Sequence, residues 1–192
     1  MQITHSHILL DACCVINFCA SGQFLAILKS LPAEIVVTTV VKERELKTLQ
    51  RLQEEENDAV LEFEEVIKQG FLKVVDFESE EEEESFVNYS VDLDDGESAT
   101  CAIAVHRKWA IATDDNKAIK FLQKNFPHLH ILSSPEIIKH WSEKQSIDSL
   151  VLSNVLNAIR IKGRYVPQKN APLRNWWQKS SDISEKCRGS VC

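Results

Sequence analysis

Carboxylate side chains at four separate places in the sequence are the residues most able to do chemistry. Asp11 follows the apolar residues 8–10, and Asp114 and Asp115 follow the apolar residues 109–113. Each apolar run is typical of a buried strand in a parallel sheet. Because ligands of such sheets collect beyond the carboxyl ends of the strands, we expect these acids to meet at one edge.

Two glutamates are expected at the same edge of the sheet. Glu43 lies in the first turn or so of a helix after a second predicted strand, and Glu97 lies in the first turn of a helix after Gly96. Each also fits an ordinary helix start, and one of Glu43 and its neighbour Glu45 is expected to be only a solvated helix residue. The prediction therefore depends on the ordered set of acids.

Clustered carboxylates predict a metal site. They repel one another, and this repulsion raises their pKa values unless a cation compensates it. Oxygen ligands of this kind suit Mg²⁺ or Mn²⁺. Such ions activate water, stabilise a leaving oxygen and neutralise phosphate charge during in-line displacement. The acidic set therefore indicates metal-dependent hydrolysis of phosphodiester bonds.

The elements that must position these acids alternate between strands and helices, which predicts an α/β fold with a mostly parallel sheet covered on both faces. One main domain, residues 1–146, is expected to precede a C-terminal helix and a basic, partly irregular tail, residues 147–192. The expected strands are residues 7–10, 35–37, 72–75, 109–113 and 129–132. The expected helices are residues 15–20, 60–67, 97–105, 117–123 and 147–161. Three more helices are expected: one that ends near Leu28, a long one that is capped by Thr38 or Thr39 and contains Leu46, Leu49 and Leu52, and one that is capped by Ser134.

In their order and spacing, these motifs resemble the PIN-domain family. The resemblance rests on residues 8–11 with Asn17 after them, and on residues 40–43, 95–99 and 112–117. It covers residues 7–145 and implies a three-layer α/β/α fold, a Mg²⁺ or Mn²⁺ site and endonuclease activity on RNA. Many bacterial and archaeal members are toxins of toxin–antitoxin pairs, and for this chain that role is an analogy.

The resemblance also implies roles for single residues. By position, Asn17 would orient Asp11, and Thr113 would help to fix the last acidic loop. The metal ligands would be Asp11, Glu43, Glu97 and one of Asp114 and Asp115.

The net charge of −7 argues at first against a nucleic-acid partner, because phosphate binding depends on Lys and Arg. Residues 1–136 carry 12 basic and 25 acidic side chains, however, whereas residues 137–192 carry 10 basic and 4 acidic ones. The basic C-terminal part interleaves cations with Trp176 and Trp177, a mixture that suits single-stranded nucleic acid. The competing interpretation, which we favour, is that the tryptophans pack on the domain and the cations pair with its acidic surface. The candidate substrate-binding residues are Asn17, Thr113, Arg164 and Lys169.

The sequence argues against a zinc ribbon, a secreted protein and a membrane protein. Its six cysteines form no CxxC pair, so we expect reduced thiols packed as small apolar residues and not zinc ligands of a ribbon. His5 and His7 are interpreted as ordinary flanking residues, and the acidic run 80–84 as a solvated loop or an exposed helix start. No apolar stretch approaches the ~20 residues of a membrane span, and Asp11 interrupts any signal-peptide core. We expect a protein of the cytoplasm with no membrane partner.

The main prediction is a metal-dependent endoribonuclease, with the toxin of a toxin–antitoxin pair as its candidate role. Its candidate partners are an RNA substrate, an antitoxin or other protein, and a second copy of the chain. One alternative is a catalytically inactive PIN-like module that binds RNA or protein, although such a role gives no reason to retain mutually repelling carboxylates. Another is a phosphatase or phosphoacceptor domain with Asp11 as nucleophile, which lacks an obvious Lys or Ser/Thr constellation after the later strands.

Overall fold

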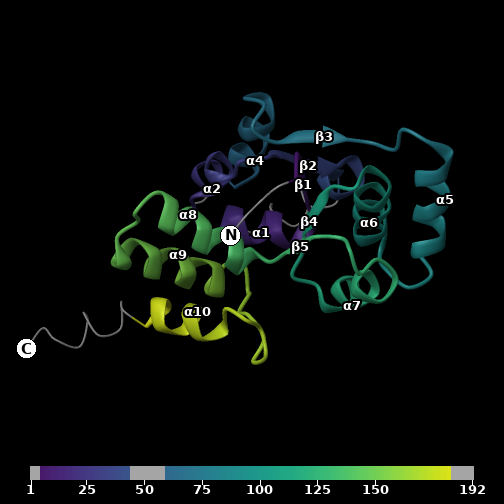
Figure 1. The fold of residues 1–192 in the computed structure, drawn as a ribbon. Coiled ribbons are helices and arrows are strands. Elements are labelled where there is room, and N and C mark those ends of the chain that lie inside the picture. The colour runs from purple at the N-terminus through teal and green to yellow at the C-terminus, as the bar shows by residue number, and fades with distance from the viewer. Residues whose placement is uncertain (1–4, 44–58, 183–192) are drawn as a thin grey trace, which may run out of the picture.

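The computed structural model describes residues 5–43 and 59–182. Their five strands form one all-parallel sheet in the order β3-β2-β1-β4-β5 (Figure 1). The chain runs outward from β1 to β2 and β3 and then returns past β1 to β4 and β5, so the winding direction reverses between β1 and β4. The strands are β1 (His7–Leu10), β2 (Glu34–Thr38), β3 (Lys73–Val75), β4 (Ala110–Ala112) and β5 (Ile131–Leu132).

Helices cover both faces of this sheet, because alternate residues of each strand point to opposite sides. Ile8 and Leu10 belong to one buried cluster, and Leu9 between them belongs to a second one. The first cluster is completed by α1 (Ala12–Ala20), α2 (Phe24–Ser30), α4 (Ala59–Lys68), α8 (Ser134–Lys144) and α9 (Ser149–Ile161). The second is completed by α6 (Asp95–Arg107) and α7 (Asn116–Asn125), with α5 (Glu80–Tyr89) packed on α6 (Figure 1). The predicted three-layer α/β/α fold is confirmed.

Two predicted helix caps are resolved by hydrogen bonds. Thr38 Oγ1 accepts from the backbone N–H of Val41 at 3.1 Å, so Thr38 caps a helix of which residues 39–43 are described. The predicted continuation of this helix through residues 44–58 lies outside the described residues. The cap of α8 is Ser133, and the prediction of Ser134 was wrong by one residue, because Ser133 and Glu136 form a reciprocal capping box. Ser134 is the first residue of α8, and its hydroxyl takes part in the site.

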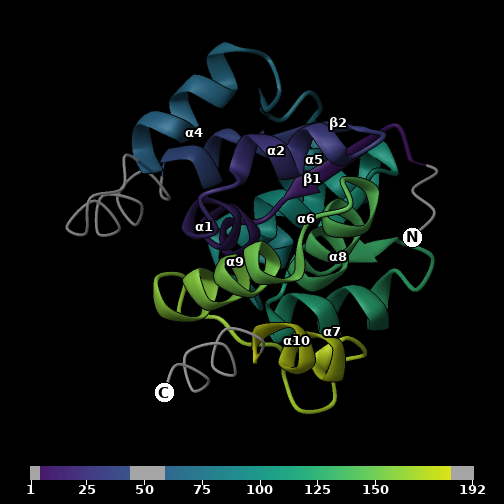
Figure 2. The same cartoon turned by 90° about the vertical axis from the view of Figure 1, so that its left-hand side faces the viewer.

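The C-terminal part packs on the same core. Figure 2 shows α9 against α1, with α10 (Arg174–Ser181) on the far side of α9. The irregular tail predicted beyond Gly163 was wrong at α10, because Trp177 anchors this helix in the core with 1% of its surface exposed. The interpretation that the tryptophans pack on the domain is confirmed, since Trp176 is also half-buried against that core. The domain boundary at residue 146 stays a prediction.

The acidic run begins α5 and is not wholly solvated. Ser79 caps the helix, and the glutamates in its first turn suit the positive end of the helix dipole. Glu82 is buried and forms a two-pronged ion pair with Arg107, at 2.7 Å from Nε to Oε1 and 2.8 Å from Nη2 to Oε2. The run therefore supplies one ion pair that joins α5 to α6.

Within residues 5–43 and 59–182, no helix is by itself both long enough and apolar enough to cross a membrane. The pair α1 and α2 meets that test only together, and the two are bent by 117°.

Candidate metal centre

The ends of β1 and β4 are joined at the point where the sheet reverses its winding. Asp11 continues the pairing of the two strands, since its backbone N–H donates to Ala112 O at 2.9 Å. Its side chain then caps α1, with Oδ1 accepting from Ala12 N at 2.8 Å. The buried hydroxyl of Thr113 donates to Asp11 Oδ2 at 2.7 Å. The carboxylate that ends β1 is thus fixed by the residue that follows β4.

Asp115 is held beside Asp11 by the same hydroxyl. Its backbone N–H donates to Thr113 Oγ1 at 3.1 Å, so Thr113 does fix the last acidic loop. The Asp115 side chain caps α7, where Oδ1 accepts from the N–H groups of Lys117 and Ala118. No hydrogen bond from the described part of the chain occupies Oδ2. One oxygen of Asp115 is therefore fixed and the other is available to a ligand.

Glu97 is the acid on which the charges of the neighbouring acids act most clearly. It forms a capping box with Asp94 at the start of α6, which sets the position of both carboxylates. Partial burial raises the pKa of Glu97 to about 7, and the negative charges of Asp94, Asp115 and Asp11 add to this shift. Burial also raises the pKa of Asp11, as does the charge of Asp94. Acids from β1, α6 and the loop after β4 are thus brought into one electrostatic cluster.

No ion pair among the described residues neutralises these four acids. Their repulsion is the cost that a bound cation would remove. The donors are all carboxylate oxygens, and Asp94 and Asp115 are accessible to solvent at least in part. This set fits a hard divalent ion such as Mg²⁺ or Mn²⁺.

Asp94 was missed by the sequence prediction. A capping-box signal was nevertheless present, because Asp94 precedes Glu97 by three residues at a helix start. The described contacts do not test the prediction that Glu43 lies with the other acids. Its side chain is exposed, and no described interaction joins it to the other acids. The start of its helix does lie near the start of α6, since a Cβ built on Gly96 would be 3.5 Å from Val41 Cγ2.

Asp114 differs from Asp115 in that both of its oxygens are occupied. Oδ1 accepts from the backbone N–H of Ser134 and from the hydroxyl of Tyr165, each at 3.0 Å. Oδ2 accepts from the side-chain amide of Asn17 at 3.0 Å. Burial raises the pKa of Asp114 in spite of these bonds. Asp114 therefore ties β4, α1, α8 and the C-terminal segment together.

The predicted role of Asn17 as the residue that orients Asp11 was wrong. Its amide nitrogen donates to Asp114 and, at 3.2 Å, to Ser134 Oγ. The reason is helical geometry, because Asn17 lies more than one turn of α1 beyond Asp11 and projects toward the start of α8. Asn17 still belongs to the site, through a different acid.

The C-terminal segment closes on the site through Tyr165 and Gly163. Tyr165 packs edge-on against Trp177, with ring centroids 5.7 Å apart, and its hydroxyl reaches Asp114. A Cβ on Gly163 would lie 2.8 Å from Ile159 O and 3.0 Å from Asn17 Oδ1, so only glycine fits without a shift. Neither residue had a signal in the motifs of the N-terminal part. Arg164 and Lys169 flank Tyr165 in sequence and are exposed, without a described contact to the acids.

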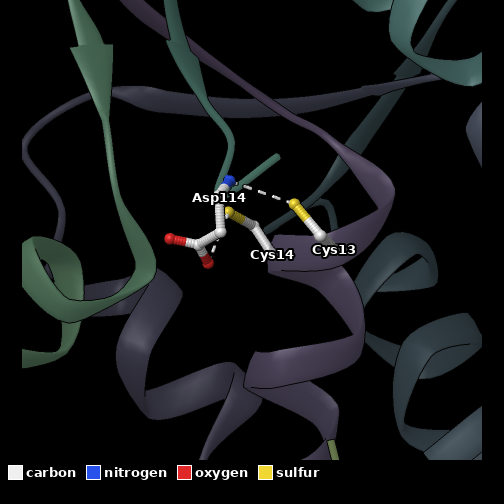
Figure 3. Close-up of side chains that lie close together, drawn as sticks. All are labelled: Cys13, Cys14 and Asp114. Atoms are coloured by element: carbon white, nitrogen blue, oxygen red, sulfur yellow. Dashed lines mark hydrogen bonds between the residues drawn. The ribbon is translucent and has the colours of Figure 1, made fainter. Parts of the chain in front are cut away.

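Cys13 and Cys14 border the acids at the start of α1. Both are free thiols, as predicted, and Cys14 is fully buried. Figure 3 shows them beside Asp114, whose backbone N–H donates to Cys13 Sγ at 3.1 Å. The Cys13 thiol in turn donates to Asp11 Oδ2 at 3.4 Å. The site therefore contains sulfur as well as carboxylate oxygen.

A cavity of about 530 Å³ opens beside Asp114. Its walls come from α7, the start of α8 and the segment 165–173. Its polar lining includes Lys120, Gln123, Gln168 and Asn170, and Tyr165 lies between the cavity and the core. A volume of this size admits a small organic ligand.

The protein is thus a doubly wound α/β protein, with carboxylates clustered at the point where the parallel sheet reverses its winding. A family model described as a PIN domain matches residues 7–172. The chain belongs to the PIN-domain family, which is a nuclease-type fold whose members commonly use divalent metal ions. No curated protein matches this sequence.

Proposed function

We propose that this protein is a metal-dependent endoribonuclease that hydrolyses RNA phosphodiester bonds. The observation that carries the proposal is that acids from separate elements meet: the Thr113 hydroxyl joins Asp11 to the loop of Asp115, and the charges of both acids add to the effect of burial on the pKa of Glu97. Such mutual repulsion disfavours the metal-free site and favours a site that holds a divalent cation. The family supports the same activity, because PIN domains are generally nucleases.

Asp11, Glu97 and Asp115 are the proposed ligands of Mg²⁺ or Mn²⁺, and Glu43 would complete the set from the second helix. When bound, the ion would supply an activated water and charge stabilisation for the leaving oxygen. Asp115 is preferred to Asp114, because its charge acts on Glu97 together with that of Asp11, whereas the Asp114 carboxylate is held by Ser134, Tyr165 and Asn17. Thr113 holds Asp11 and the loop of Asp115 in a fixed relation before substrate arrives.

The RNA strand is proposed to cross the acidic edge toward the C-terminal segment. The cavity beside Asp114 would take the nucleotide next to the cleaved bond, with the amides of Gln123 and Asn170 available to its base. Lys120 on its wall, and the exposed Arg164 and Lys169 near it, would meet the phosphates. This arrangement gives the basic C-terminal part a role in substrate binding.

The biological setting is proposed by analogy with the family. We propose a cytoplasmic toxin that is held inactive by an antitoxin, with self-association as a further candidate interaction. The four described free cysteines agree with a reducing compartment. Co-expression with the product of a neighbouring gene tests this role: suppression of toxicity supports it, and growth unaffected by the protein alone contradicts it.

The catalytic test uses labelled single-stranded RNA with Mg²⁺ or Mn²⁺, and a DNA strand of the same sequence in parallel. Asp11→Asn should lower the cleavage rate by a factor of about 100 or more, because it removes a charge that would face the ion. Asp76→Asn is the matched control, since Asp76 is exposed and its carboxylate accepts its described hydrogen bond from the adjacent Phe77 N. Equal activity of Asp11→Asn and wild type would refute the proposal, as would the absence of cleavage by wild type under broad conditions.

A catalytically inactive binding module is the second candidate, and one observation favours it. Several of the acids already have a structural task, since Asp11, Asp94 and Asp115 each cap a helix. Titration with Mn²⁺ discriminates, because acids retained only as caps would bind the ion weakly.

A further inference from the structure

The two thiols at the start of α1 converge on Asp114 in a way that the proposed nuclease chemistry does not use. Three possible ligand atoms lie within 4.8 Å of one another: the Sγ of Cys13, the Sγ of Cys14 and one carboxylate oxygen of Asp114 (Figure 3). They come from two elements far apart in sequence, the first turn of α1 and the loop after β4. We propose that these three residues bind a thiophilic divalent ion of the Zn²⁺ or Cd²⁺ class, at a site that adjoins the carboxylate cluster and shares none of its proposed ligands.

The choice of ion follows from the donor atoms. Two sulfurs and one carboxylate oxygen suit a soft or borderline ion, whereas Mg²⁺ and Mn²⁺ prefer oxygen alone. A Zn–S bond of about 2.3 Å in a tetrahedral site places two sulfurs ~3.8 Å apart. The observed spread of less than 4.8 Å therefore needs only a small inward movement of the side chains. Three protein ligands leave a fourth position for water.

Hydrogen bonds already hold both sulfurs in place. Cys13 Sγ accepts from Asp114 N at 3.1 Å, and Cys14 Sγ accepts from the Ser134 hydroxyl at 3.3 Å. Donors to sulfur of this kind orient and stabilise thiolate ligands in metal sites. The thiol protons point to the carboxylates, from Cys13 to Asp11 and from Cys14 to Asp114 at 3.8 Å. An entering ion replaces these protons.

The binding step balances in charge and atoms. Two S–metal bonds and one O–metal bond form, two S–H bonds break, and two protons pass to the buffer. The two thiolates and the Asp114 carboxylate then surround the divalent ion, which leaves one negative charge on the complex. No oxidant or reductant takes part. The site therefore requires only reduced cysteines, which the structure has.

The experiment measures Cd²⁺ binding to the full-length protein in a phosphine reductant, by the ultraviolet charge-transfer absorption of the S–Cd bond. Cys187→Ser/Cys192→Ser serves as the background, so that thiols near the C-terminus do not contribute. We expect one equivalent of Cd²⁺ to saturate the signal. Cys13→Ser and Cys14→Ser should each halve the absorption per bound ion and weaken binding by roughly 100-fold or more.

Cys19→Ser is the matched control, because Cys19 is buried in the same helix and does not belong to the ligand group. Near-ultraviolet circular dichroism verifies that each variant is folded. Asp114→Asn is the second variant and keeps both thiols, so it should keep the S–Cd band and bind more weakly. The proposal is overturned if the background protein gives no S–Cd band, or if the band survives in a folded Cys13→Ser/Cys14→Ser protein.

Discussion

Replacing Tyr165 by phenylalanine removes one hydroxyl from the site and leaves the ring packed on Trp177. The lost bond is the 3.0 Å contact to Asp114 Oδ1, and Ser134 N, Asn17 and Cys14 remain as donors to this carboxylate. A hydrogen bond to a charged group contributes about 1.5–3 kcal/mol. Because the other donors stay, we expect the lower part of that range.

The predicted consequence is a loosened loop after β4, and with it a displaced Asp115. Partners that orient metal ligands typically change affinity or activity by about 10- to 100-fold. Tyr165→Phe should therefore lower Mn²⁺-dependent RNA cleavage about 10-fold. The melting temperature should fall by only ~3–6 °C, as expected for about 1.5 kcal/mol in a chain of this size.

The assay compares initial cleavage rates over a Mn²⁺ titration, with Tyr89→Phe as control. Tyr89 is the only other tyrosine, and its ring packs on Phe121 and Phe126. A Tyr165→Phe protein with wild-type rate and wild-type Mn²⁺ dependence would refute the role assigned to the C-terminal segment. If Tyr89→Phe lowers the cleavage rate equally, the loss of activity in Tyr165→Phe is explained by reduced folding stability instead.

Three further predictions follow from the same geometry. Since the folded-state pKa of Glu97 is raised from 4.5 to about 7, its protonation stabilises the metal-free fold at low pH and this contribution is lost as pH rises through about 7. As pH rises from 4.5 to about 7, the melting temperature of wild type should therefore fall relative to that of Glu97→Gln, and it should recover when Mn²⁺ is added. A difference in melting temperature between the two proteins that does not change with pH would contradict this prediction. Gly163→Ala should cost about 1–3 kcal/mol in chemical denaturation because its Cβ meets Ile159 O and Asn17 Oδ1, and unchanged stability would contradict the close approach. One equivalent of Cd²⁺ should slow Mn²⁺-dependent cleavage, because it draws Asp114 toward Cys13 and Cys14; full activity with Cd²⁺ bound would contradict that coupling.

The sheet and the acids that end its strands were accessible to sequence reasoning. The run before Asp11 is continuously apolar because β1 is the central strand and is buried on both faces. The same holds for β4, whose end carries Thr113, Asp114 and Asp115. Parallel winding then brings their carboxyl ends together without any knowledge of side-chain contacts.

The connections between the acids were less accessible, because they depend on where helix faces point. Asn17 was assigned to Asp11 by its position in the family pattern, whereas the turn of α1 brings its amide to Asp114. The contact between Tyr165 and Asp114 was not predicted, because the two residues are distant in sequence and no periodic pattern links them. The helix α10 was hidden by prolines and polar residues, and only the burial of Trp177 explains it.

If acids from three elements share one divalent cation, anomalous diffraction from crystals soaked in Mn²⁺ will locate that ion. We expect an anomalous peak bounded by Asp11, Glu97 and Asp115. A fully occupied Mn²⁺ elsewhere, or no peak at this edge of the sheet in crystals where the three side chains are ordered and accessible, would contradict it.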